Sequence, residues 1–187
     1  MNNTAAKTAL GGLMTALTVV ILMPTALEFF VYALPAAAAL LTMLAVMELG
    51  KGWAFGIFAG ASAISLLVLP NKEAAVIYAA FFGYYPIVKA VLESKLRRVP
   101  EWIAKFLVFN VSMLGAYFVL FKVFGIPLEQ LTGSEGQTGF FAKYAALLLL
   151  LSGNIIFPFY DICLTRYASL YLKRWQRHFR RIFRFKK

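Results

Sequence analysis

The sequence is poor in cysteine, histidine and charge. Its 187 residues include one cysteine and one histidine, and charged residues make up 14% of the chain. A single cysteine cannot form an internal disulfide, and the usual Cys/His zinc site needs more ligands than these two residues supply. Soluble domains contain about a quarter charged residues. These shortages exclude disulfide-stabilised secreted scaffolds and zinc enzymes, and they argue against a water-soluble core.

Recognised catalytic motifs are also missing. The chain has no His-Glu-x-x-His, no Gly-x-Ser-x-Gly, no Walker A loop and no aspartate-rich metal motif. Its 8 acidic residues are scattered rather than paired at a fixed spacing. We therefore expect a protein without enzymatic activity that uses neither a metal nor a cofactor.

Long apolar runs dominate instead, because 61% of the residues are hydrophobic. A helix needs about 20 mostly apolar residues to cross a hydrocarbon layer of about 30 Å, and backbone amides in lipid must bond internally. The runs lack the period of two that barrel strands show. Residues 1–165 are therefore predicted to form one all-α bundle of six transmembrane helices, over residues 8–23, 29–47, 53–69, 74–92, 105–124 and 140–164.

Basic residues outnumber acidic residues by 19 to 8, which gives a net charge of +11. If the termini and the connections after the second and fourth spans share one side of the membrane, only Lys72, Lys122 and Lys143 lie on the other side. Loops rich in lysine and arginine stay in the cytoplasm. We therefore expect a multi-pass protein of the cell membrane with both termini cytoplasmic.

Residues 166–187 form a basic tail. Leu172, Trp175, Phe179 and Ile182 recur at helical spacing and predict an amphipathic helix that lies on the inner leaflet. RNA binding is the alternative, but the aromatic side chains that would stack on bases would then be buried in lipid. We expect anionic lipid rather than nucleic acid as the partner, bound through Lys173, Arg174, Arg177, Arg180, Arg181 and Arg184.

Two spans carry strips of small residues, which let helices approach closely in lipid. Gly52, Gly56 and Gly60 recur every four residues, and we expect this face to be packed tightly inside the bundle. The first span has a similar face, which either packs internally or docks another membrane protein; it consists of Ala5, Ala9, Gly12 and Ala16.

Polar and aromatic residues gather at two turns on the predicted outer side. Two short turns beneath the longer loop 125–139 could enclose a small polar ligand, because such pockets combine apolar walls with a few directed polar groups. Ordinary solvated turns with interfacial aromatics are the alternative. The candidate substrate-binding residues are Glu28, Tyr32, Asn71, Lys72, Glu73 and Tyr78.

Few polar side chains fall inside the spans. Asn110 and Asn154 are predicted to form hydrogen bonds between helices. Asp161 is expected to pair with Arg166 or with a lysine near Lys89, since an unpaired charge in the membrane is costly, and a proton relay is the alternative role. Pro86 is expected to kink the fourth span.

A family resemblance follows from three stretches of the sequence. These are the run from Leu34 to Ala38, the run from Glu48 to Gly52, and the small residues Gly56, Gly60, Ser62 and Ser65. Together with the size and the six spans, they resemble the substrate-binding S components of energy-coupling factor transporters.

The resemblance implies a subunit that binds a vitamin or similar micronutrient from outside. It also implies docking on a transmembrane T component that two cytoplasmic ATPases drive. The docking motif of that family would fall on Ala5 and Ala9, or in weaker form on Gly12 and Ala16.

A membrane scaffold is the alternative function. The rod-shape-determining membrane protein D family has a similar topology. Such a protein would bind cytoplasmic partners through the basic tail and the inner loops, without a ligand.

Overall fold

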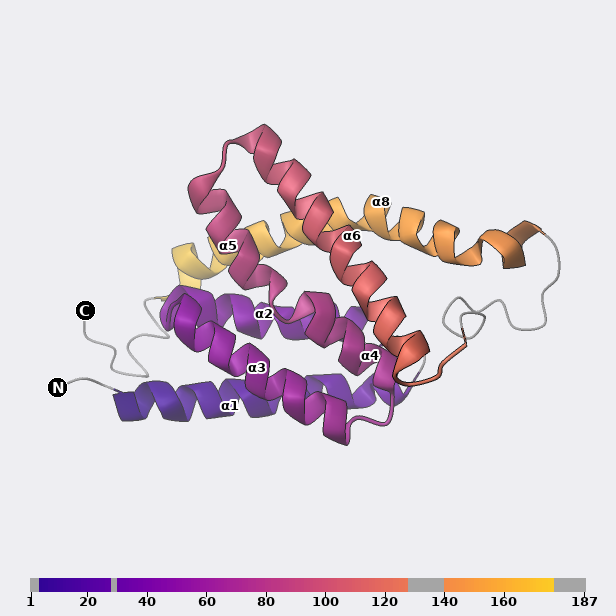
Figure 1. Cartoon of the computed structure of the whole chain (residues 1–187). Coiled ribbons are helices and arrows are strands. Elements are labelled where there is room, and N and C mark those ends of the chain that lie inside the picture. Colours follow the sequence, from indigo (N-terminus) through magenta and orange to yellow (C-terminus); the bar gives the residue numbers. More distant parts are fainter. Residues whose placement is uncertain (1–3, 28–29, 128–139, 177–187) are drawn as a thin grey trace.

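The computed structural model describes residues 4–27, 30–127 and 140–176, and these contain helices and no strand (Figure 1). The backbone of residues 140–143 is described, but not their side chains. In chain order the elements are α1 (Thr4–Leu22), the 3-10 turn η1 (Met23–Ala26), α2 (Ala33–Glu48), α3 (Lys51–Val68), α4 (Lys72–Ile77), the π-helical turn η3 (Tyr78–Phe82), α5 (Tyr85–Lys95), α6 (Arg98–Lys122), α8 (Phe140–Leu170) and the π-helical turn η4 (Tyr171–Trp175).

Five helical stretches are long and apolar enough to cross a membrane, as a multi-pass membrane protein requires. They are Thr4–Ala26, Lys51–Val68, Lys72–Lys95, Arg98–Lys122 and Tyr144–Trp175. The second predicted span is shorter than expected, because α2 has 16 residues and is therefore about 24 Å long at about 1.5 Å per residue. The all-α class is confirmed, and a sixth crossing stays a prediction.

α2 lies at the centre of the molecule. It packs against α1 and α3 on one side and against α5 and α8 on the other. Ala38, Ala39 and Ala45 of α2 are fully buried, and such small side chains let the neighbouring helices come close. The bundle is thus built around α2, although this helix is shorter than the five stretches long enough to cross a membrane.

The glycine strip of α3 does not form the tight contact that the sequence predicts. A Cβ atom added at Gly52 or Gly56 would meet no atom within 4 Å, and only Gly60 approaches a neighbour, with Thr15 Cγ2 at 3.5 Å. The buried face of α3 is formed instead by Ala54, Ile57, Ala61, Ser62 and Ser65. The spacing of the glycines correctly places them on one face of α3, but it does not predict whether that face points into the bundle or away from it.

The helix from Lys72 to Lys95 is interrupted in the middle. Gly83 N–H donates to Tyr78 O at 2.7 Å, which widens the backbone into a π-turn, and α5 then begins at Tyr85 with Pro86 in its first turn. Proline has no amide hydrogen, and its ring clashes with the preceding turn of a regular helix. The interruption expected at Pro86 is confirmed.

The two ends of the bundle differ in which turns they hold. In Figure 1 the start of α1, the α2–α3 turn and the end of α8 lie at one end, and the end of α1 and the α3–α4 turn lie at the other. Gln176 Nε2 also donates to Glu48 Oε1 at 3.1 Å, which ties η4 to the end of α2. This arrangement agrees with successive passes in alternating directions.

Candidate functional site

An aromatic cavity of about 240 Å³ lies between η3, α6 and α8. The π-turn turns two phenylalanines toward it, while α6 and α8 supply the facing walls. Ser152 and Ile156 on its α8 side are also exposed on the outer surface of the bundle. The cavity is lined by Tyr32, Phe81, Phe82, Phe109, Met113, Tyr117, Leu149, Leu150, Ser152, Gly153, Ile156, Phe157 and Tyr160.

Stacked aromatic rings give this cavity rigid walls. The rings of Phe109 and Phe157 stack with centroids 4.9 Å apart, and Phe81 meets Phe109 edge-on at 5.2 Å. Such aromatic pairs contribute beyond the area they bury. The lining, to which Tyr32 and Tyr117 also contribute, is almost wholly apolar, so the cavity suits a ligand that is mostly apolar or aromatic.

Tyr32 is the predicted binding residue that the structure places in the cavity wall. Its hydroxyl donates to Glu73 Oε1 at 2.9 Å and so joins the two turns that the sequence singled out. The Tyr32 phenol is thus the hydrogen-bond donor of this contact.

Two other predicted residues act at helix ends. Asn71 Oδ1 accepts the amide hydrogen of Ala74 at the start of α4, while its Nδ2 donates to Thr25 O at 3.2 Å. Lys72 Nζ donates to the carbonyl oxygens of Leu66 and Leu69 at 3.0 and 2.8 Å, where α3 ends. A cation at a helix C-terminus is favourable.

The remaining predicted residues are placed differently. Tyr78 is fully buried beside the ring of Phe58, away from the cavity lining. Glu28 lies outside the described residues. At the tail, Lys173 and Arg174 are exposed on η4, and Arg177, Arg180, Arg181 and Arg184 lie outside the described residues.

The small-residue face of α1 points outward. All four predicted docking residues are exposed, and the buried face of α1 is formed by Leu10, Gly11, Met14 and Thr18 instead. Internal packing, one of the two alternatives, is thus not how this face is used. The exposed face consists of Ala5, Ala9, Gly12 and Ala16.

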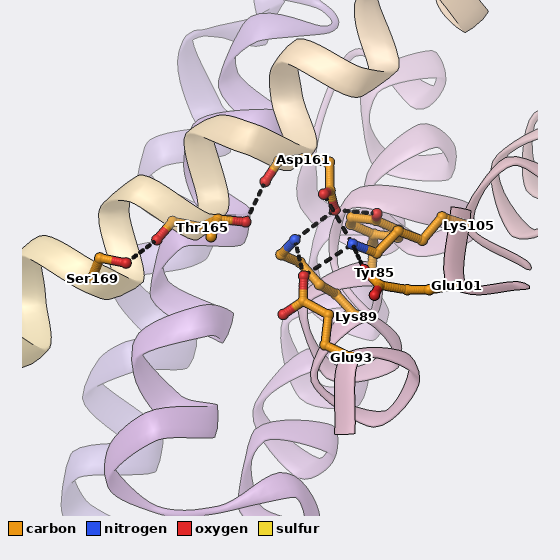
Figure 2. Close-up of polar contacts among 8 residues, drawn as sticks. All are labelled: Tyr85, Lys89, Glu93, Glu101, Lys105, Asp161, Thr165 and Ser169. Atoms are coloured by element: carbon orange, nitrogen blue, oxygen red, sulfur yellow. Dashed lines mark hydrogen bonds and ion pairs between the residues drawn. The ribbon is translucent and has the colours of Figure 1, made fainter. Parts of the chain in front are cut away.

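A buried ion network lies beside the cavity, between α5, α6 and α8 (Figure 2). Lys89 and Lys105 both approach Asp161, with nitrogen to oxygen distances of 2.7 and 2.9 Å. All three side chains are at most 4% exposed. Opposite charges at this depth must pair, because leaving one unpaired in an apolar medium is costly.

Two more acidic residues and a tyrosine complete the network. Glu93 contacts Lys89 at 2.5 Å and Lys105 at 2.9 Å, and Glu101 contacts Lys105 at 2.7 Å. Tyr85 donates its hydroxyl hydrogen to Asp161 Oδ1 at 2.6 Å. Two lysines and three carboxylates leave the network with one net negative charge.

The network confirms one sequence prediction and extends it. Asp161 does pair with Lys89, whereas Arg166 forms no ion pair among the described residues. Lys105 was predicted only as a residue at the start of a span. It has Glu101 four residues earlier, and that spacing was the available signal that this lysine belongs inside a charged cluster.

Tyr85 connects the ion network to the cavity. Its ring lies 4.8 Å from Phe81 and 5.4 Å from Phe157, measured between centroids, and both phenylalanines line the cavity. Its hydroxyl meanwhile holds Asp161. A shift of Phe81 or Phe157 would therefore move the Tyr85 ring and, through its hydroxyl, change the contact with Asp161.

The two asparagines that the sequence predicts to bond between helices do so with each other. Asn110 Nδ2 donates to Asn154 Oδ1 at 2.8 Å, and Asn154 Nδ2 donates back to Asn110 Oδ1 at 2.9 Å. This reciprocal pair joins α6 to α8, as expected for partly buried amides in a membrane bundle.

Within the residues that the structure describes, no group of histidine, cysteine, aspartate and glutamate is arranged to hold a metal ion. Comparison of the chain with protein-family models, curated proteins and solved structures gave no match. The interpretation of the site therefore depends on its own geometry.

Proposed function

We propose that this protein is a membrane-embedded binding subunit. It captures a small, vitamin-like molecule on the outer side and presents it to an ATPase-driven transport module. The observation that carries the proposal is the aromatic cavity between η3, α6 and α8.

The size and walls of the cavity support a small apolar ligand. Its volume of about 240 Å³ is below the roughly 300–1,000 Å³ typical of sites for drug-sized ligands. The Phe81, Phe109 and Phe157 rings offer flat apolar walls, and the Tyr32 hydroxyl offers a polar group that could orient the ligand. One aromatic ring system with a polar substituent fits this description.

The exposed small-residue face of α1 supports a partner in the membrane. Ala5, Ala9, Gly12 and Ala16 leave space for the backbone of another helix, and this is where the resemblance places the docking motif. The partners under this proposal are a transmembrane T component and cytoplasmic ATPases.

A ligand screen tests the proposal most directly. The purified full-length protein would be melted with a panel of vitamins, nucleobases and amino acids. A ligand present at about 100 times its Kd stabilises the folded state by about 2.7 kcal/mol, which raises Tm. We expect a specific shift with an aromatic member of the panel.

Two isoleucines of α8 provide a matched pair of variants. Ile156 lines the cavity, whereas its neighbour Ile155 does not, and both side chains are more than half exposed. Ile156→Trp should fill the cavity and abolish the ligand-dependent shift, and Ile155→Trp should leave it intact. Equal behaviour of the two variants would contradict binding in this cavity.

The docking face is tested separately. Ala16→Trp should abolish co-purification with a T component and leave ligand binding unchanged, because the added ring blocks close helix approach. Leu114→Trp, at an exposed position on α6, is the control and should still co-purify. If no compound of the screen shifted Tm, and deletion of residues 173–187 abolished function, the scaffold alternative would be favoured.

A further inference from the structure

A second pocket, of about 410 Å³, borders the ion network on the side of Glu93 and Glu101. It lies between the end of α5, the first turns of α6 and the second half of α8. Charged, hydroxyl and apolar side chains all contribute to its wall, which is formed by Glu93, Arg98, Glu101, Trp102, Lys105, Asp161, Ile162, Thr165, Arg166 and Ser169.

Most hydrogen-bond donors in this wall are already used. Lys105 gives its three protons to Glu93, Glu101 and Asp161. The hydroxyls of Thr165 and Ser169 donate to backbone carbonyl oxygens one turn earlier on α8, at 3.0 and 2.9 Å (Figure 2).

The arginines in the wall are different. Among the described residues, neither Arg98 nor Arg166 has an ion pair or a side-chain hydrogen bond. Glu93 and Glu101 each use one carboxylate oxygen on the lysines and keep the other. The pocket therefore offers two guanidinium donors beside two carboxylate acceptors.

The charge of the site as a whole favours an anion. The wall carries three cations and three carboxylates, and the buried Lys89 behind it, which contacts Glu93 and Asp161, brings the total to one positive charge. A phosphate diester carries a single negative charge and would neutralise the pocket. Guanidinium groups also match phosphate oxygens in a two-pronged geometry that lysine cannot offer.

The apolar side of the pocket indicates that the phosphate belongs to a lipid. Ile162 is in the wall and is 49% exposed, and Phe159 and Ile155 continue that exposed apolar surface along α8. Acyl chains attached to a bound headgroup could lie along it. Trp102 lies in the first turns of α6, and tryptophan is enriched at the level of lipid headgroups.

We propose that this pocket binds the headgroup of an anionic glycerophospholipid whose headgroup carries hydroxyl groups. Arg98 and Arg166 hold its phosphate, and the headgroup hydroxyls donate to Glu93 and Glu101. This site is separate from the aromatic cavity, and it does not depend on the transport proposal. It would bind one lipid at the inner end of the bundle and join α6 to α8 there.

The test uses the full-length protein, purified and stripped of lipid in a neutral detergent. Its Tm is measured while phosphatidylglycerol, phosphatidylcholine or inorganic phosphate is added. Phosphatidylglycerol should raise Tm at concentrations at which phosphatidylcholine does not, and inorganic phosphate should have no effect. An equal shift with phosphatidylcholine, or an equal shift with inorganic phosphate, would overturn a specific lipid site.

Two double variants of equal charge locate the effect. Arg98→Gln with Arg166→Gln should weaken phosphatidylglycerol binding about tenfold or more, because charge-assisted hydrogen bonds are lost. Lys95→Gln with Arg97→Gln removes the same charge from exposed residues outside the pocket wall and should leave binding unchanged. Equal weakening by both pairs would mean diffuse attraction to the basic surface and would overturn the site.

A third double variant keeps the test valid if Arg98→Gln with Arg166→Gln disturbs the fold. Arg98→Lys with Arg166→Lys keeps the charge and removes the two-pronged donors. We expect its affinity for phosphatidylglycerol to fall between those of the wild type and the glutamine pair. Affinity equal to that of the wild type would contradict a bidentate contact with phosphate.

Discussion

Individual charges decide much of the energetics of this bundle. Lys89, Lys105 and Asp161 are buried in a protein whose surroundings are apolar, so each of them is stable there only with its partners. Breaking a buried pair costs more than the pair itself contributes, because the remaining charge is left without compensation. Asp161 has the largest effect, since it serves both lysines and Tyr85.

Asp161→Asn should therefore be severely destabilising. We expect the free energy of unfolding to fall by about 3 to 5 kcal/mol, because both lysines lose a charged partner at once. Titration with a denaturing detergent measures this loss of unfolding free energy. Glu101→Gln is the matched variant, and it should cost less because Glu101, which is 15% exposed, has Lys105 as its one ion-pair partner in the described part of the chain. A smaller loss for Asp161→Asn than for Glu101→Gln would contradict this role.

The asparagine pair can be tested by a double-mutant cycle. Asn110→Ala and Asn154→Ala each remove one side of a reciprocal contact, and the double variant removes both. Hydrogen bonds between membrane helices contribute about 0.6 kcal/mol on average and at most about 1.7 kcal/mol. We expect a coupling energy in this range from the unfolding free energies. Strictly additive losses would mean that the two amides do not support each other.

At the scale of single elements, the break at η3 positions the cavity. The π-turn rotates Phe81 and Phe82 relative to α4, and α5 restarts at Tyr85 in the register that aims its hydroxyl at Asp161. Gly83 lies at a position where the neighbouring rings leave no room for a side chain. A Cβ atom there would lie 2.6 Å from Phe58 Cδ2 and 2.9 Å from Tyr78 Cζ. Tyr78 is a core residue and Phe58 packs against that core, so neither ring can move aside without disturbing its neighbours.

Two glycines of the bundle should respond in opposite ways to alanine. Gly83→Ala overpacks the core and should cost about 1 to 3 kcal/mol of unfolding free energy. Gly56→Ala adds a methyl group in open space on α3 and should gain about 0.4 to 1 kcal/mol, because alanine has less freedom to lose. Thermal melts of both variants would measure the difference. Similar Tm values would contradict the packing described at η3.

At the scale of the whole molecule, the orientation of the bundle depends on its charges. The turn at Pro70 is predicted to lie outside and the turn at Lys95 inside, and both residues are exposed. In a Cys163→Ser background, Pro70→Cys should react with a membrane-impermeant maleimide in intact cells. Lys95→Cys should react only after the membrane is permeabilised. Labelling of both from the same side would contradict the predicted orientation.

The sequence predicts the helical class and most of the spans because a membrane admits few other backbones. It predicts that Asn110 and Asn154 form hydrogen bonds between helices, and it offers Arg166 or a lysine near Lys89 as the partner of Asp161, because polar groups inside a membrane must be paired. It does not predict which face of α3 is buried, that α2 is short, or that Lys105 joins the network. Those features depend on contacts between distant residues, such as the 56 positions that separate Lys105 from Asp161.

The ion network also constrains how the chain is made. Lys89 and Lys105 are synthesised well before Asp161, their shared partner on α8. Until that helix emerges from the ribosome, the carboxylates available to the two lysines are Glu93 and Glu101, on α5 and α6 themselves. Asp161 then adds the most deeply buried carboxylate of the network to a helix pair that is already neutral. The charges therefore let α5 and α6 enter the membrane as a pair, and the contacts that join them to α8 are completed only when α8 has been made.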